Sequence, residues 1–169
     1  MLYIDFDGVI LDTETLLFEA WRKIPNRHLL DEDAKEEYIQ TRDWEYIINN
    51  ASIINDSVYY LKYMDPSTSC ILTKINSLYN EGAAKIKWVR KNNIKQNIIL
   101  VPFLFKKTDI VDAKDNTLID DSLHNLDDWA NNGGYPIFFD MDDDNIDSWN
   151  KPNTKGYQRI LSLEKIKRL

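Results

Sequence analysis

The chain has 169 residues, which predicts one compact domain with room for a small insertion. Its 28 acidic side chains outnumber its 21 basic ones and give a net charge of −7, which argues against a nucleic-acid polymer as partner. No apolar run approaches the ~18 residues of a membrane span, and no secretion signal is visible, so we expect a cytoplasmic chain. Cys70 is the only cysteine, so we expect neither an internal disulfide nor a cysteine zinc site.

Five short apolar runs predict buried strands. Each is rich in Ile, Val, Leu or Phe, the pattern of strands covered on both faces of a parallel sheet. Helical periodicity over 77–91 and 122–132, the latter stopped by Gly133-Gly134, predicts strand–helix alternation and a doubly wound α/β sheet. A last helix is expected near 162–168. The predicted strands are residues 2–6, 70–73, 97–101, 117–120 and 136–139.

The stretch 13–66 interrupts this alternation. It contains several amphipathic segments and no convincing strand, and it ends in the loop signature Asp65-Pro66-Ser67. We therefore predict a small helical cap over 13–66, inserted after the first strand. The α/β core is then formed by 1–12 and 67–169.

The segment Asp5-Phe6-Asp7-Gly8 carries the clearest chemical signal. Residues two apart on a strand point to the same side, so Asp5 and Asp7 are expected to address one site at the carboxyl end of the first strand. Ligands bind at that edge of open α/β sheets, and Gly8 permits a sharp turn close to a ligand. Two carboxylates this close repel each other, so the site needs a cation or a proton on one member.

A second acidic pair, Asp120-Asp121, ends the fourth predicted strand. Parallel strands end at the same edge of a sheet, so the two acidic pairs are expected to meet there. Mg²⁺ prefers hard oxygen ligands together with waters and a phosphate. The two pairs therefore predict a magnesium site.

Phosphate binding is predicted at the ends of the second and third strands. Thr73 offers a hydroxyl and backbone amides to a phosphate oxygen. A lysine supplies the balancing positive charge; Lys107 fits the strand end best, and Lys106 and Lys114 are the alternatives. Lys74, directly after Thr73, adds a further cation that either contacts phosphate or faces solvent.

The order of these motifs resembles the haloacid dehalogenase-like (HAD) superfamily of phosphotransferases. Asp5-Phe6-Asp7-Gly8-Val9 is similar to the first motif and Leu72-Thr73 to the second, while a lysine stands for the third. Leu118-Ile119-Asp120-Asp121 is similar to the fourth. The resemblance covers residues 1–12 and 67–139 and implies a Rossmann-like core.

The resemblance also implies a role for each residue. Asp5 would be the nucleophile that forms an aspartyl-phosphate, and Asp7 the acid/base that protonates the leaving oxygen and later activates water. Mg²⁺ would lie between the Asp5 carboxylate, the Asp7 backbone carbonyl and Asp120, with Asp121 as a water-mediated or more distant ligand. The residues implied to hold the phosphoryl group are Gly8, Thr73 and Lys107.

Three functional hypotheses follow. The first is a Mg²⁺-dependent phosphomonoesterase acting on a small phosphorylated metabolite. The compact helical insertion and the Leu-Ile-Asp-Asp ending resemble the 5′(3′)-deoxyribonucleotidase branch of the superfamily. This resemblance implies a (deoxy)nucleoside monophosphate as the substrate. The second is a phosphosugar phosphatase or phosphomutase, favoured by Asp12-Thr13-Glu14. The third is a non-catalytic module that binds a phosphometabolite, which has no chemical need for both Asp5 and Asp7. The sequence does not indicate an oligomeric state.

One aromatic residue is a candidate substrate contact. On a helix that starts near Thr13, Phe18 and Trp21 share a face. We predict that Phe18 covers the site and stacks on a nucleobase, and that Trp21 fills the core of the cap.

Four other features are interpreted as structural. The acidic run at 140–144 lacks the glycine and the closing glutamate of a calcium loop, so we expect a solvated loop. His28 and His124 are expected at the surface, and Cys70 is expected to be a small buried side chain.

Overall fold

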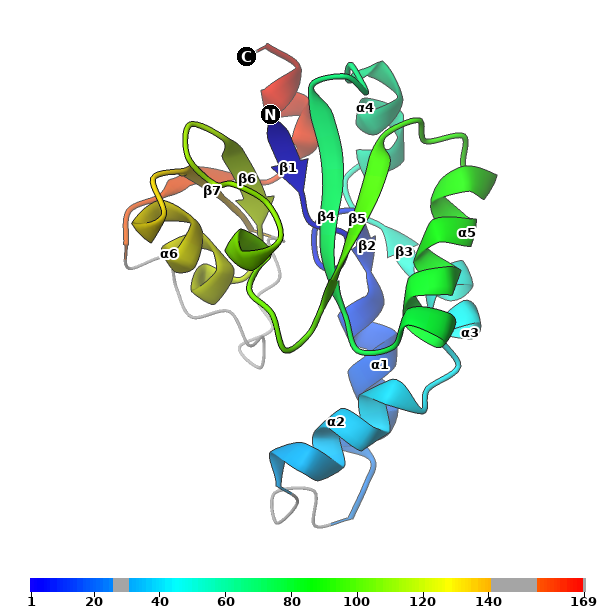
Figure 1. Cartoon of the computed structure of the whole chain (residues 1–169). Coiled ribbons are helices and arrows are strands. Elements are labelled where there is room, and N and C mark those ends of the chain that lie inside the picture. The colour runs from blue at the N-terminus through cyan, green and yellow to red at the C-terminus, as the bar shows by residue number, and fades with distance from the viewer. Residues whose placement is uncertain (26–30, 141–154, 169) are drawn as a thin grey trace.

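The computed structural model describes residues 1–25, 31–140 and 155–168. Its centre is a six-stranded sheet with the order β5-β4-β1-β6-β7-β8, and every pairing in it is parallel (Figure 1). The predicted doubly wound sheet is therefore confirmed, with one strand near the end of the chain, β8, that was not predicted. The strands are β1 (Leu2–Ile4), β4 (Ser69–Ile75), β5 (Asn97–Pro102), β6 (Thr117–Asp120), β7 (Tyr135–Phe139) and β8 (Gln158–Ile160).

Helices cover both faces of the sheet. Alternate strand residues point to opposite faces, so Ile71 joins one apolar cluster with α5 (Ala83–Lys91), and Leu72 joins another with α6 (Leu123–Asn131). Both predicted helices are confirmed, although the first begins as a π-helical turn, η2 (Leu78–Gly82). The closing helix is a 3₁₀ helix, η4 (Leu163–Arg168).

In its described residues, the stretch predicted as a cap contains four helices and one strand of a two-stranded sheet. Strand β3 pairs antiparallel with β2, so the expectation of no strand in this stretch was wrong. Such two-residue strands carry too little alternation to be recognised from sequence. The elements are β2 (Leu11–Asp12), α1 (Thr13–Arg22), α2 (Glu32–Gln40), α3 (Trp44–Asn50), β3 (Ser52–Ile53) and α4 (Ser57–Tyr63).

The helices of this stretch have two different placements. Helices α1 and α2 extend beyond the carboxyl edge of the sheet, whereas α3 packs beside α5 and α4 beside η4 (Figure 1). Side chains of α1, α3 and α4 belong to the same apolar cluster as β1 and α5. The hydrophobic core therefore does not divide at residue 66, and of the described helices in this stretch only α1 and α2 lie beyond the strand ends.

Polar side chains set where two of these helices begin. The Asp31 carboxylate accepts a hydrogen bond from the Ala34 amide at 2.9 Å, and the Asp43 carboxylate accepts one from the Tyr46 amide at 2.9 Å. Each bond satisfies a backbone donor that has no partner inside its helix. The N-caps therefore fix the starts of α2 and α3.

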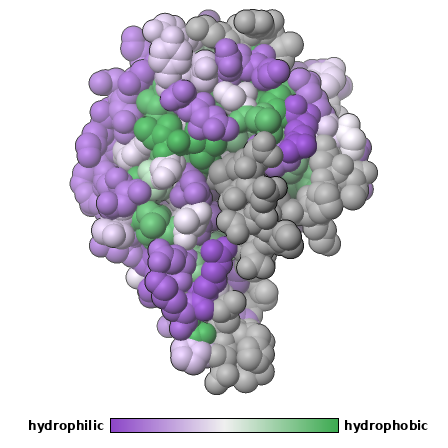
Figure 2. Space-filling model, turned by 180° about the vertical axis from the view of Figure 1, so that it is seen from behind, coloured by the Kyte–Doolittle hydropathy of each residue, from purple (hydrophilic) through white to green (hydrophobic). Residues whose placement is uncertain are grey.

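The surface is mixed in polarity. Hydrophilic side chains cover much of the face shown in Figure 2, with apolar patches between them in its upper half. Among the described helices, none is both long and apolar enough to cross a membrane.

Candidate active site

The first acidic pair lies where β1 ends. Asp5 directly follows Ile4, the last residue of β1, and its amide donates to the Ile119 carbonyl at 2.9 Å. Gly8 has a φ of +69°, and a Cβ atom built there would lie 2.1 Å from the Asp121 carboxylate. A side chain at this position would therefore meet both backbone strain and a collision. The predicted turn at Gly8 thus lets the first acidic segment pack directly against the second.

The structure places Lys107 between two carboxylates. Its ammonium lies 2.9 Å from Asp5 Oδ1 and 2.6 Å from Asp120 Oδ2, and its side chain is buried. Burial works against the charge on Lys107, but attraction to Asp120 and Asp5 outweighs it and raises the lysine pKa. Of the alternatives, Lys106 pairs with Asp128 at the surface, and Lys114 is exposed. Among the three candidate lysines, Lys107 is the one at the acidic pairs.

Three buried carboxylates converge beside this lysine. Asp5, Asp120 and Asp121 each offer an oxygen, and these atoms all lie within 4.8 Å of one another. Burial raises the pKa of Asp5 to about 7, repulsion from Asp120 and Asp7 adds to the shift, and Lys107 only partly offsets it. The local negative charge is therefore incompletely neutralised. Buried, closely spaced carboxylate oxygens suit a hard divalent cation such as Mg²⁺, so these residues fit the implied metal.

A second buried lysine, Lys85, lies on the other side of the site, and sequence reasoning did not identify it. Its ammonium contacts Asp7 Oδ2 at 2.5 Å and Glu81 Oε1 at 2.7 Å, and it donates to Thr73 Oγ1 at 3.1 Å. A fourth acceptor is the Lys74 carbonyl at 2.9 Å. Lys85 therefore links the predicted acid/base residue to the predicted phosphate-binding threonine.

Asp7 is held from a third direction by the first residue of α1. The Thr13 hydroxyl donates to Asp7 Oδ1 at 2.6 Å, and Thr13 is buried. Thr73 donates to the other oxygen, Asp7 Oδ2, at 3.4 Å. Three elements, α1, β4 and α5, thus fix the orientation of one carboxylate.

The other predicted residues have simpler positions. Phe18 is only 8% exposed and belongs to the main apolar cluster, so its ring has little surface for a nucleobase, and the stacking role is not supported. Trp21 packs edge-on against Tyr38 with ring centroids 4.9 Å apart, as expected for a cap-core residue. His124 is exposed and Cys70 is buried, as predicted. His28 and residues 141–144 of the acidic run lie outside the described residues.

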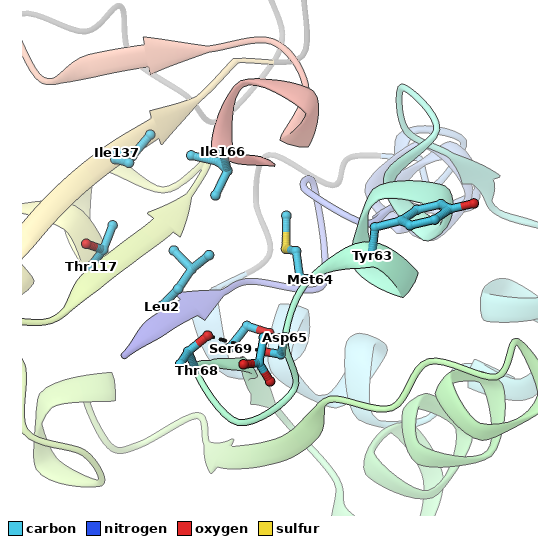
Figure 3. Close-up of a pocket in the computed structure, with 9 residues that line it drawn as sticks. All are labelled: Leu2, Tyr63, Met64, Asp65, Thr68, Ser69, Thr117, Ile137 and Ile166. Atoms are coloured by element: carbon cyan, nitrogen blue, oxygen red, sulfur yellow. Dashed lines mark hydrogen bonds between the residues drawn. The ribbon is translucent and has the colours of Figure 1, made fainter. Parts of the chain in front are cut away.

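A cavity of about 360 Å³ lies elsewhere in the molecule (Figure 3). Leu2, Ser69 and Thr117 line it, and these residues are the first of β1, β4 and β6. The cavity is therefore at the amino edge of the sheet, opposite the acidic pairs. The carboxylate on its wall, Asp65, is already bonded to the amide and hydroxyl of Ser67 at 2.8 and 2.7 Å. The chemistry predicted from the sequence thus belongs to the carboxyl edge and not to this cavity.

The fold is similar to solved structures of HAD-superfamily proteins. A haloacid dehalogenase-like hydrolase from Bacteroides fragilis aligns with a TM-score of 0.62 at 12% identity, covering 98% of both chains. β-Phosphoglucomutase from Clostridium difficile aligns with a TM-score of 0.59 at 14% identity, covering 99% of this chain and 95% of that one. D,D-heptose 1,7-bisphosphate phosphatase from Burkholderia thailandensis gives 0.56 at 13% identity, with coverage of 99% and 95%.

These likenesses establish the fold. No protein-family model and no curated protein sequence matches the chain. At 12–14% identity the aligned structures support the HAD-type architecture predicted from the motifs. The resemblance to the deoxyribonucleotidase branch stays a prediction.

Proposed function

We propose that this protein is a Mg²⁺-dependent phosphomonoesterase that works through an aspartyl-phosphate on Asp5. The observation that carries the proposal is the convergence of two acidic pairs and a buried lysine at the carboxyl edge of a HAD-type sheet. A phosphate ester is a dianion, so a carboxylate can attack it only where positive charge cancels the repulsion. Lys107 and a metal ion would supply that charge.

In the first step Asp5 attacks the phosphorus atom of the ester. Lys107 holds Oδ1 of Asp5, which leaves Oδ2 as the attacking atom. A bond forms between Oδ2 and phosphorus, and the bond from phosphorus to the leaving oxygen breaks. Asp7, oriented by Thr13 and Lys85, gives its proton to that oxygen, so the product leaves as an alcohol.

In the second step water attacks the phosphorus of the aspartyl-phosphate. Asp7, now a carboxylate, takes a proton from this water as the new oxygen–phosphorus bond forms. The bond between phosphorus and Asp5 breaks, which restores the Asp5 carboxylate and yields inorganic phosphate. The same residue thus serves as acid and then as base.

The metal would be held by the carboxylates of Asp5, Asp120 and Asp121, together with the Asp7 carbonyl that the resemblance implies. When bound, Mg²⁺ supplies positive charge against the phosphoryl oxygens and orients them. Gly8, Thr73 and Lys107 stay the proposed contacts to the phosphoryl group.

The proposed substrate is a small phosphorylated metabolite. A nucleoside monophosphate is one candidate, supported by the compact helical insertion, although the burial of Phe18 argues against a base contact from this side chain. A phosphosugar is the alternative, supported by Asp12-Thr13-Glu14, and the acceptor of the phosphoryl group would then be water or a second sugar hydroxyl. A panel of nucleoside monophosphates and sugar phosphates, assayed for phosphate release and for isomerised product, separates these candidates.

Asp5→Asn tests the proposal directly. An amide cannot form the aspartyl-phosphate, so we expect phosphate release to fall below detection while the fold persists, with the exposed Asp33→Asn as matched control. Removing Mg²⁺ with a chelator should also stop wild-type turnover. If Asp5→Asn kept more than a few per cent of the wild-type rate, the nucleophile assignment would fail. A wild-type chain that binds phosphate but releases none from any ester would instead be a binding module.

A further inference from the structure

Lys74 is a charged residue that the proposed mechanism does not use. It follows Thr73 near the end of β4 and pairs in register with Val101 of β5. Side chains alternate along a strand, so Lys74 points to the opposite face from Thr73 and Lys85. Its side chain is half-buried, and in the described part of the chain its ammonium forms no ion pair.

Strand β4 packs against the 3₁₀ turn that begins with Lys107. The charges that act most strongly on Lys74 are the ammonium of Lys107 and the carboxylates of Asp120, Asp5 and Asp128. The first three belong to the candidate site, whereas Asp128 pairs with Lys106. Burial lowers the pKa of Lys74, and repulsion from Lys107 lowers it further. Lys74 is therefore a cation placed beside another cation, close to the nucleophile.

Each of these carboxylates already has another partner. Asp5 and Asp120 form ion pairs with Lys107 at 2.9 and 2.6 Å. Asp128 accepts from the Lys106 ammonium at 2.7 Å and from the Thr108 hydroxyl at 2.5 Å. The charge of Lys74 thus has no directly bonded counter-ion among the described residues. A half-buried cation in this position is stabilised when an anion joins it.

We propose that the Lys74 ammonium binds an anionic oxygen of the substrate, from a phosphate or a carboxylate group. This inference rests on the proposed phosphomonoesterase function. The anion has two sources: the phosphoryl group that is transferred, or a second acidic group carried by the leaving part of the same substrate. The other lysines at this edge, Lys85, Lys106 and Lys107, each pair with a carboxylate, whereas Lys74 pairs with none among the described residues, so Lys74 offers an anion contact in addition to the one proposed for Lys107.

The test replaces Lys74 by Met, which keeps the length of the stem, and by Arg, which keeps the charge. Each variant is assayed with p-nitrophenyl phosphate, which has no second acidic group, and with a hexose bisphosphate. Binding of inorganic phosphate is measured by calorimetry in the presence of Mg²⁺, because this readout does not need turnover. Lys114→Met, which removes an exposed lysine, is the matched control and should change none of these values.

Two results support the inference. If Lys74→Met raises KM about tenfold for both esters and weakens phosphate binding about tenfold, the anion is the transferred phosphoryl group. If it raises KM only for the bisphosphate, the anion is a second acidic group on the substrate. Lys74→Arg should recover most of the loss in either case.

Unchanged KM for both esters together with unchanged phosphate binding would overturn the inference, as would a fall in kcat alone. A wild-type chain that hydrolyses neither ester contradicts the proposed function. Calorimetric binding of inorganic phosphate and of the hexose bisphosphate to wild type and to Lys74→Met then still decides the role of Lys74: weaker binding of either anion by the variant supports it, and equal binding of both overturns it.

Discussion

Lys107 and Lys85 are both buried at the carboxyl edge of the sheet, but their surroundings differ. Lys107 begins the short 3₁₀ turn η3 (Lys107–Asp109) and faces Asp5 and Asp120. Lys85 lies on α5 and faces Asp7 and Glu81, the latter one turn earlier on the same helical stretch. The first lysine serves the predicted nucleophile and metal ligands, whereas the second serves the predicted acid/base.

The number of acceptors separates the two roles. A lysine ammonium has three N–H donors. Lys85 has four acceptors in reach, so none of its donors is left for a ligand. Among the described residues Lys107 donates to Asp120 and forms an ion pair with Asp5, so at least one of its donors is left for a phosphoryl oxygen. We therefore infer that Lys107 contacts substrate and that Lys85 positions Asp7.

The largest expected effect comes from Lys107→Met. This change removes the charge that offsets Asp5 and Asp120 and the donor for the phosphoryl group. We expect kcat/KM to fall about 10³-fold, equivalent to about 4 kcal/mol of lost transition-state stabilisation. Steady-state phosphate release measures it.

Lys106→Met and Lys114→Met are the controls for that comparison, because both side chains extend from the surface. We expect each to keep turnover within about twofold of wild type. A large loss in either control, with Lys107→Met active, would show that the phosphate lysine had been assigned to the wrong position.

Lys85→Met should affect stability more than binding. It leaves Glu81 buried and Asp7 partly buried without their cation, and breaking a buried pair in this way costs about 3 kcal/mol. The double variant with Glu81→Gln removes one orphaned charge and should recover part of that loss. Urea unfolding measures both, and KM should change less than kcat because Asp7 is misplaced rather than absent.

A drop in phosphate affinity as large as that of Lys107→Met, with unchanged stability, would contradict the division of roles. It would mean that Lys85 rearranges to meet the substrate. The two lysines would then be equivalent phosphate contacts.

Asp120→Asn tests whether Asp120, which pairs with Lys107, also holds the metal ion. The amide keeps the shape of the side chain but loses charge, so the Mg²⁺ concentration for half-maximal rate should rise about tenfold. Titration of the rate with Mg²⁺ measures it, with Asp112→Asn, at an exposed position, as control. If the titration curve did not move, Asp120 would pair with Lys107 without binding the metal ion.

The cluster of Lys107 with Asp5 and Asp120 was predictable from the sequence, whereas the cluster of Lys85 with Asp7 and Glu81 was not. Asp5 follows β1, Asp120 ends β6 and Lys107 lies shortly after β5, and parallel strands end at one edge, so chain order alone brings them together. Lys85 lies in the first turn of α5, a helix whose polar residues are expected to face solvent. The Glu81–Lys85 spacing of four was visible, but such pairs are usually exposed. The π-helical turn η2 precedes α5 and shifts the phase that periodicity would assign.

The burial of Phe18 was missed for a related reason. The helix and its apolar face were predicted correctly, but the direction of that face was not. Helix α1 packs against α3, its Trp21 lies edge-on against Tyr38, and its Phe18 belongs to the main apolar cluster. Periodicity reports which residues share a face and leaves open what that face covers.

The smallest expected effect concerns Glu14, whose carboxyl group is repelled by Asp7, the partner of Lys85. Burial raises its pKa to about 7, and repulsion from Asp7 and Asp12 adds to the shift. Between the ordinary pKa of 4.5 and about 7 the folded chain therefore binds more protons here than the unfolded chain, and stability falls as pH rises through this window.

Glu14→Gln removes this dependence of stability on pH. At pH 8 the variant should be more stable than wild type by about 1 kcal/mol, below the ~3 kcal/mol of the full shift because solvent reaches the half-buried side chain. At pH 4 the difference should vanish, and the exposed Glu37→Gln should show none at either pH. Urea unfolding at the two pH values measures this difference in stability. An equal gain at both pH values would mean that Glu14 acts through packing and that the surroundings of Asp7 carry no excess negative charge.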